Sequence, residues 1–187
     1  MRKQRYVLAE MLLMISGANH RACLQMYVDN IQLFNVVPGS SHNHQAWPGG
    51  YHDHVEESMN FIIDLYKMFT RTRTLPFSLS DALTVMFLHD IEKPWKYELD
   101  AGGRLVPIEA LKSKSAQHEF RARKLREYGV VLSPDQENAM KYVEGEYADY
   151  SRTELKMGQL AALCHMADVA SARLFFDYPR SGEGRRE

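Results

Sequence analysis

The chain has 187 residues, of which 45% are hydrophobic and 25% are charged, a composition typical of one globular domain with a sizeable core. Its 23 Lys and Arg balance 24 Asp and Glu, so the net charge gives no indication of binding to nucleic acid or to a membrane. No apolar run reaches the roughly 18–20 residues of a membrane span. Only two cysteines occur, Cys23 and Cys164, which predicts a cytoplasmic location rather than a disulfide framework.

Hydrophobic residues recur at spacings of three and four along most of the chain, which predicts an all-α helical bundle. The predicted helices span residues 3–15, 20–34, 50–69, 80–88, 108–128, 134–147 and 153–176. Ser80-Asp81 is a start signal for the fourth of these helices. Ser151 and Glu154 have the spacing of a capping box, which predicts the start of the last helix.

Two internal segments depart from the helical pattern. Residues 35–50, "NVVPGSSHNHQAWPGG", predict a loop, and the alternation around "DAGG" predicts a small β-hairpin near residues 97–107. Without a repeat or a linker, we expect one domain over residues 1–187. The helices within residues 1–35 are expected to cover the core or to form a homodimer surface, and the tail at 179–187 is expected to be frayed.

The segment "FLHDIEKPW", at residues 87–95, places His89 and Asp90 at the end of an apolar run. A buried carboxylate is costly unless a partner neutralises it, and a divalent cation does so effectively. His54 lies at the start of another predicted helix, and Asp168 lies within the apolar segment "GQLAALCHMADVASARLFF". Helical domains build internal metal sites from ligands on separate helices, so these four residues are candidate metal ligands.

The segments "PGGYHDHVEES", "FLHDIEKPW" and "CHMADVA" resemble, in this order, the motifs of the HD superfamily of metal-dependent phosphohydrolases. The resemblance covers roughly residues 46–172 and implies an HD-domain fold. It assigns the metal to His54, His89, Asp90 and Asp168. The implied cofactor is a divalent ion, with Mn, Co, Ni, Zn, Fe and Mg all left open.

Members of this family that bind two metals have additional ligands in the middle of the chain. The resemblance places one at His118 and the other at Glu144, where the family often has histidine. Glu144 either replaces that histidine with a carboxylate, which hard cations accept, or is a helix-surface acid beside a one-metal site. Both interpretations stay open. His165, one helical turn before Asp168, is expected to be a supporting or core residue.

In the chemistry that the resemblance implies, the ion activates water for attack on phosphorus. Asp90 is the predicted catalytic residue that orients this water or accepts its proton. Lys93 is predicted to stabilise the phosphate charge. The family usually has glycine before this lysine, whereas this chain has Glu92, which adds negative charge near a phosphate site.

Further substrate contacts are predicted on both sides of the ligand segments. His44 and Trp47 lie on the loop before His54, where they are placed to contact a base or sugar. Hydrophobic packing is the alternative interpretation of Trp47. Arg121 and Lys124 are predicted to extend the phosphate-binding surface. Both belong to a basic stretch that is otherwise typical of a solvated helix face.

The predicted function is therefore hydrolysis of a nucleotide or another small-molecule phosphate ester, and the motifs do not separate monoesters, diesters and triphosphates. One alternative is a non-catalytic HD-domain ligand sensor or interaction module, against which the intact ligand set counts. A second alternative is a mixed-valent di-iron oxygenase on the same scaffold. That enzyme class needs histidines at both added positions, so Glu144 counts against it.

Overall fold

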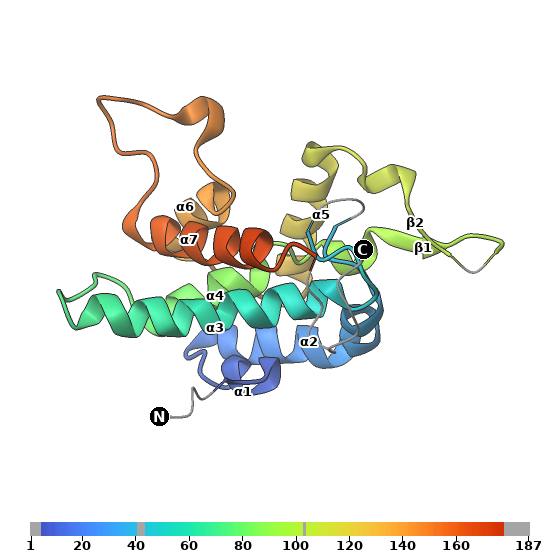
Figure 1. The fold of residues 1–187 in the computed structure, drawn as a ribbon, viewed down its shortest axis with the longest axis horizontal. Helices are drawn as coiled ribbons and strands as arrows, with labels where there is room; N and C mark the ends of the chain where they lie inside the picture. Colours follow the sequence, from blue (N-terminus) through green and yellow to red (C-terminus); the bar gives the residue numbers. More distant parts are fainter. Residues whose placement is uncertain (1–4, 41–43, 103, 178–187) are drawn as a thin grey trace.

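The computed structural model describes residues 5–40, 44–102 and 104–177 (Figure 1). Its α-helices are α1 (Leu8–Leu12), α2 (Ala18–Val36), α3 (Gly50–Thr70), α4 (Leu79–Leu88), α5 (Lys114–Glu127), α6 (Pro134–Tyr142) and α7 (Gln159–Leu174). Two antiparallel strands and three 3-10 helices complete the described elements, namely β1 (Tyr97–Leu99), β2 (Leu105–Pro107), η1 (Lys93–Trp95), η2 (Glu109–Leu111) and η3 (Tyr147–Asp149). The predicted all-α class with one hairpin is confirmed. The tail expected to be frayed at 179–187 lies outside the described residues.

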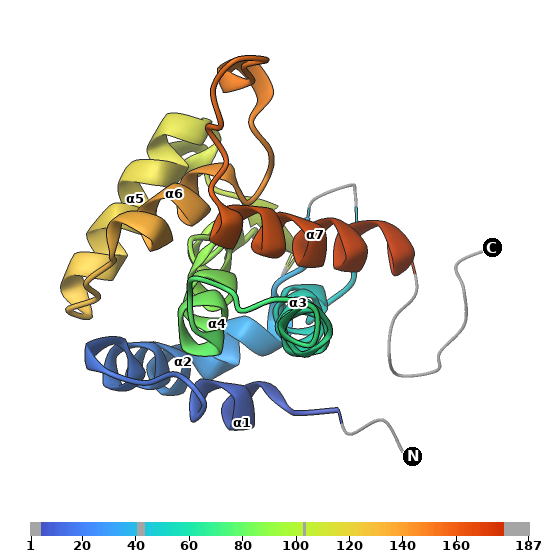
Figure 2. The same ribbon diagram turned by 90° about the vertical axis from the view of Figure 1, so that its left-hand side faces the viewer.

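Helix α3 lies in the middle of the bundle, in contact with α1, α2, α4 and α7 (Figures 1 and 2). α7 packs along one side of α3, while α1 and α2 lie on the opposite side. α4 packs against α2, α3, α6 and α7. The hairpin projects from one end of the bundle. None of the described helices combines the length and the apolar character that a membrane crossing requires.

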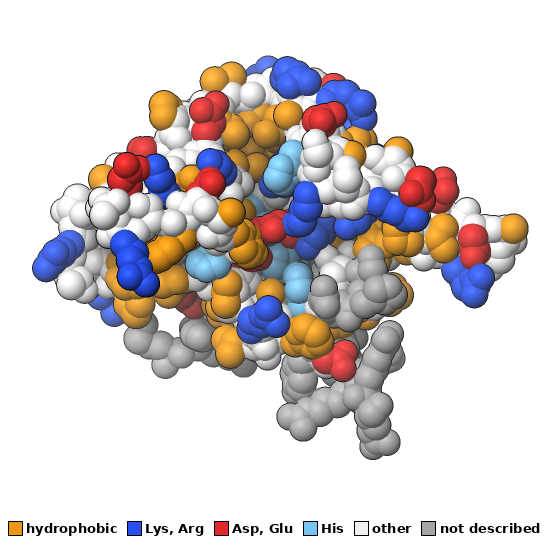
Figure 3. Space-filling view, turned by 90° about the horizontal axis from the view of Figure 1, so that it is seen from above, with side chains coloured by type: hydrophobic (Ala, Val, Ile, Leu, Met, Phe, Trp, Pro, Cys, Tyr) orange, Lys and Arg blue, Asp and Glu red, His pale blue; other side chains and the backbone are white. Residues whose placement is uncertain are grey.

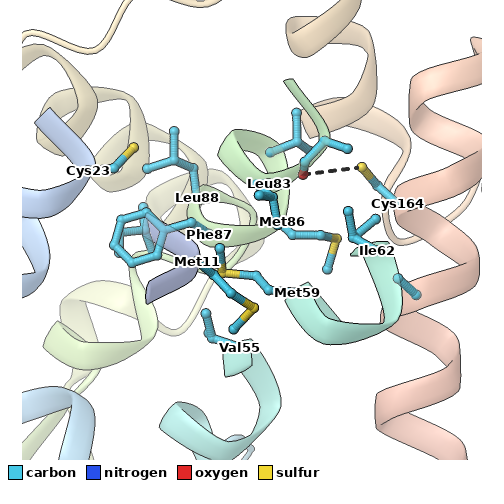
Figure 4. Packing of buried hydrophobic residues seen from close by; sticks show 14 of the residues in the cluster. Met11, Cys23, Val55, Met59, Ile62, Leu83, Met86, Phe87, Leu88 and Cys164 are labelled. Atoms are coloured by element: carbon cyan, nitrogen blue, oxygen red, sulfur yellow. Dashed lines mark hydrogen bonds between the residues drawn. The ribbon is translucent and has the colours of Figure 1, made fainter. Parts of the chain in front are cut away.

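Helix α4 carries the His-Asp pair into the interior because the whole second half of the helix is buried. Residues 82–88 are all buried and, apart from Thr84, apolar, so this part of the helix is buried on every face rather than along one stripe. Figure 4 shows Met86 and Phe87 packed among side chains of α3 and α1, including Met59 and Met11. Flexible methionines fill the irregular gaps between these helices. The buried apolar run therefore places His89 and Asp90, which follow it, at a fixed position in the interior of the fold.

The predicted start of the last helix is wrong, because α7 begins at Gln159. The Ser151 hydroxyl does accept a hydrogen bond from the N–H of Glu154, but no helix begins there. The cap of α7 is Gly158 instead, and its N–H donates to the side chain of Asn138 on α6. A tertiary hydrogen bond thus overrides the local start signal.

Other helix limits also differ from the predictions. α1 covers a small part of the predicted span, and α5 begins at Lys114 with Ser113 as its cap, because η2 precedes it. α6 ends at Tyr142, close to Gly145, whose φ of 119° is incompatible with a helix. The start signal of α4 lies at Ser78, whose hydroxyl accepts from the N–H of Asp81.

Candidate metal centre and its cavity

His54 lies in the first turn of α3, and the two preceding glycines determine how this helix meets the loop before it. Gly49 has a φ of 78°, a left-handed conformation that glycine adopts without strain. Gly50 packs so closely on the loop that a Cβ there would lie 2.0 Å from the carbonyl oxygen of Gln45. The tight junction fixes the buried His54 against the loop, with its ring centroid 5.2 Å from that of His44.

Three side chains from three helices bring their ligand atoms together. The Nε2 atoms of His54 and His89 are 3.3 Å apart, and Oδ1 of Asp168 lies 3.2 Å from the first and 3.4 Å from the second. A triangle with sides of about 3.3 Å has its centre about 1.9 Å from each corner, so an ion at the ~2.1 Å typical of zinc–nitrogen bonds fits just above its plane. The structure therefore contains a buried group that could hold a metal ion.

Hydrogen bonds behind the two imidazoles turn their Nε2 atoms toward this centre. Nδ1 of His89 donates to the carbonyl of Met86 at 2.8 Å, and Nδ1 of His54 lies 3.1 Å from Oγ of Ser171. Because a carbonyl can only accept, Nδ1 of His89 carries a proton and Nε2 is left for a cation. The Ser171 hydroxyl donates to the carboxylate of Glu57 at 3.3 Å, so it accepts from His54. Such outer hydrogen bonds orient metal ligands.

Asp90 lies beside the same nitrogen atoms and is paired with a lysine. Its Oδ2 is 3.3 Å from Nε2 of His89, 3.7 Å from Nε2 of His54 and 2.6 Å from Nζ of Lys93. α4 ends at Leu88, yet η1 keeps Lys93 on the same side of the chain as Asp90. Asp90 is therefore placed as a fourth ligand, with Lys93 as its counter-ion.

The pKa values of these groups reflect burial opposed by charged neighbours. Burial lowers the pKa of His54, whereas for His89 the effect of burial is outweighed by Asp90 and Asp168, which raise its pKa to about 10. Burial would raise the pKa of both carboxyl groups, but Lys93 and His89 hold that of Asp90 well below its usual range. The two imidazoles lower the pKa of Asp168 in the same way. Both carboxylates stay ionised. His89 carries a second proton, on Nε2, and cation binding would displace this proton.

The candidate centre lies beside a cavity of about 570 Å³, within the usual size of small-molecule sites. Asp90 and Asp168 both line it. Figure 3 shows acidic and histidine side chains in a hollow of this face, with Lys and Arg side chains close to them. The cations that line the cavity are Lys93, Lys96, Lys112, Lys114 and Arg173, and the apolar side chains that α7 and its end contribute are Val169, Ala172 and Phe176. The cavity therefore suits an anionic ligand with an apolar part.

Of the two loop residues predicted to contact substrate, the structure brings His44 to the cavity but not Trp47. His44 lines the cavity beside the ring of His54. The indole N–H of Trp47 donates to the carboxylate of Asp53 at 3.0 Å, and its ring lines a separate apolar pocket that also contains Tyr97. Of these two residues, only His44 is therefore placed to contact a substrate in the cavity.

The two cations predicted on α5 do not line the cavity. Arg121 is buried, where its guanidinium donates to the backbone carbonyl of His89 and lies 3.4 Å from the carboxylate of Glu92. It therefore supports the backbone that carries the candidate ligands and balances the charge of Glu92. Nζ of Lys124 lies 4.9 Å from the ring centroid of Trp95. Neither is placed to meet a phosphate in the cavity.

Of the two residues predicted for a second metal, Glu144 lines the cavity and His118 does not. The Glu144 carboxylate accepts hydrogen bonds of 3.1 and 2.9 Å from Nζ of Lys114, and His118 is exposed on α5. His165 donates to the carbonyl of Val143 at 2.7 Å and so holds the turn before Glu144. This is a supporting position, as expected for His165. The number of metals stays a prediction.

The sequence did not point to the residues that support the ligands from behind. Gln45 is fully buried, and its amide donates to Oγ of Ser171 at 3.0 Å. Ser171 follows Asp168 by three positions on the same face of α7, and this spacing is the one signal available for it. Gln45 lies in a loop, where no periodicity marks it. The cavity cations Lys96 and Arg173 come from separate segments and share no motif.

Comparisons with protein-family models, with curated proteins and with solved structures found no match for this chain. Fold and site together define a mostly helical protein in which a buried His-His-Asp group that could hold a metal ion lies beside a cavity lined by cations.

Proposed function

We propose that the chain is a metal-dependent phosphohydrolase with an HD-domain fold, acting on a nucleotide or another small phosphate ester. The observation that carries this proposal is the meeting of His54, His89 and Asp168 beside a cavity lined by lysines. Fixed positive groups around a reacting phosphate stabilise the charge that develops in the transition state. The metal-binding group and the cations are both required for such a reaction, and both border the same cavity.

The residues divide into two roles in the proposed reaction. The metal, when bound, supplies a Lewis acid for a phosphoryl oxygen and lowers the pKa of water. Asp90 stays ionised because its pKa is low, so it orients the attacking water by accepting a hydrogen bond and is a weak base. Lys93 is placed to donate to a phosphoryl oxygen once a cation shares the charge of Asp90.

The nucleotide part of the proposal rests on the apolar and aromatic residues of the cavity. Val169 and Phe176 are each 41% exposed and line the same cavity as the lysines. Tyr147, at the start of η3, also lines it and is 76% exposed, so its ring is available to a base or sugar. An inorganic phosphate would leave these surfaces uncovered.

We favour hydrolysis over the two alternatives for reasons that lie in the site. A di-iron oxygenase needs two further ligands, but His118 does not line the cavity and Glu144 is paired with Lys114. A non-catalytic sensor does not need a carboxylate beside the metal-binding group with a lysine 2.6 Å from it.

The proposal is tested with protein purified without chelator. We expect bound metal and turnover of at least one ester in a panel of nitrophenyl phosphates and nucleotides assayed with Mn, Co, Ni and Zn. His89→Ala and Asp168→Asn are expected to lose both. His52→Ala is the matched control. His52 lies on the same turn of α3 as His54, but its ring faces Tyr27, at a centroid distance of 6.4 Å, and it is not part of the candidate metal-binding group. Full turnover in both ligand variants would refute the mechanism, and metal binding without turnover would favour the sensor.

We also propose a cytoplasmic location. Both cysteines are free and buried, and the thiol of Cys164 donates to the carbonyl of Ala82 (Figure 4). Free thiols are typical of reducing compartments. Fractionation of native cells tests this location, and recovery of the protein outside the cytoplasmic fraction would contradict it.

A further inference from the structure

The cavity beside the metal-binding group has more cations than one phosphate needs. Its buried end contains Asp90 and Asp168, with Lys93 already paired to Asp90. Lys96 is half-buried, and Lys114 and Arg173 are exposed, so these three lie nearer the opening. The five Lys and Arg side chains that line the cavity outnumber its four carboxylates by one, and a divalent ion would bring the net charge to about +3. This exceeds the charge of a phosphate monoester, which carries about two negative charges at neutral pH.

Two of these cations have no partner in the described part of the chain. Neither Lys96 nor Arg173 forms an ion pair there, although both line the cavity. Burial lowers the pKa of Lys96, and the positive charges of Lys93 and Lys114 lower it further. Like charges gathered in a partly desolvated space repel one another, and an anion bound among them would relieve this repulsion.

We propose that Lys96, Lys114 and Arg173 form a second anion-binding subsite, so that the substrate carries two or more linked phosphate groups. This proposal rests on the proposed function, since the metal-binding group would hold the phosphate that reacts. The outer cations would hold the neighbouring phosphate of the same molecule. The substrate class is therefore a diphosphate or triphosphate ester rather than a monoester or a simple diester.

Glu144 competes with a bound anion for one cation of this subsite. Its carboxylate occupies Lys114 with hydrogen bonds of 3.1 and 2.9 Å, and it lines the same cavity. A polyphosphate competes with this carboxylate for the lysine, whereas orthophosphate bound at the metal would not reach it. The pair thus keeps Lys114 at the cavity. It makes the subsite selective for ligands with a second phosphate group, which can displace the Glu144 carboxylate from Lys114.

The test measures binding apart from catalysis, with inorganic tripolyphosphate and orthophosphate as probes in calorimetric titrations of the full chain. We expect tripolyphosphate to bind at least tenfold more tightly than orthophosphate. Lys96→Gln and Arg173→Gln are each expected to weaken tripolyphosphate about tenfold, the size of one charge-assisted hydrogen bond, with little change for orthophosphate. Arg71→Gln is the control for loss of one charge, because Arg71 ends α3 about 25 Å along the helix from His54.

Equal binding of the two probes, or wild-type tripolyphosphate binding by both subsite variants, would overturn the subsite. The same result in Arg71→Gln as in the subsite variants would also overturn it, because the effect would then be one of net charge. Turnover of phosphate esters is scored separately. A chain that binds tripolyphosphate through Lys96 and Arg173 but cleaves no ester retains the subsite and refutes the hydrolase.

Discussion

Replacing Ser171 with alanine removes one hydroxyl from α7 and leaves every candidate metal ligand in place. The hydroxyl lies 3.1 Å from Nδ1 of His54, 3.0 Å from the amide of Gln45 and 3.3 Å from the carboxylate of Glu57. Without it, the imidazole of His54 loses the acceptor that keeps Nε2 directed at the metal-binding group. We therefore expect Ser171→Ala to weaken metal binding without abolishing it.

The size of the effect follows from the bond that is lost. A hydrogen bond to a group that is charged or becomes charged contributes about 1.5–3 kcal/mol, and His54 becomes positively polarised when it binds a cation. Changes to the outer partners of metal ligands lower affinity about 10–100-fold, which is the same range. We expect a loss of this size in Ser171→Ala, together with about 1 kcal/mol of unfolding free energy for a buried hydrogen bond.

The assay is a titration with Zn²⁺ or Mn²⁺ against a chromophoric chelator, together with urea unfolding of the metal-free protein. Ser58→Ala is a matched control, because Ser58 is also fully buried but its hydroxyl donates to the carbonyl of Val55 in its own helix. We expect the control to lose similar stability and to bind metal as the wild type does. Wild-type metal affinity in Ser171→Ala, or an equal loss of affinity in Ser58→Ala, would refute the reasoning.

Three further predictions concern charge. Arg121→Met should lower the unfolding free energy by about 3 kcal/mol in urea titrations, because it leaves Glu92 buried without its ion-pair partner; an unchanged midpoint would contradict this. The pKa of His89 is raised to about 10, so its proton stabilises the metal-free fold fully below pH 6.5, and this stability is lost as the pH rises through 10. Metal binding displaces the same proton, so affinity should rise by up to about tenfold per pH unit between pH 6 and 9, and a flat profile would contradict a proton held on His89 over this range. Glu144→Gln should tighten tripolyphosphate binding by freeing Lys114 and leave the metal content unchanged, whereas a lost metal would make Glu144 a ligand.

The candidate metal-binding group was open to prediction because its residues contrast with their surroundings. His89 follows an apolar run, and Asp168 interrupts an apolar helix, so each marks a polar position in the core. These signals lie within short stretches of the sequence, so they can be recognised without knowledge of the fold.

What escaped prediction depends on contacts between distant segments. Arg121 lies in a helix with no apolar stripe and resembles a surface residue, yet it is buried because Glu92 and the carbonyl of His89 need a cation between them. The start of α7 depends on Asn138 of another helix, so no signal near residue 153 could give it. The indole N–H of Trp47 donates to Asp53 and so lies outside the cavity. The position of Trp47 beside the motif did not reveal this hydrogen bond.

The most direct test is the metal content of the purified chain and of its ligand variants, measured by mass spectrometry after dialysis without chelator. We predict bound divalent metal in the wild type and in His52→Ala, and its loss in His54→Ala, His89→Ala and Asp168→Asn while each variant keeps its helical circular dichroism. Folded wild-type protein that takes up none of Mn, Fe, Co, Ni or Zn, or ligand variants that keep the wild-type content, would contradict a metal centre at these residues.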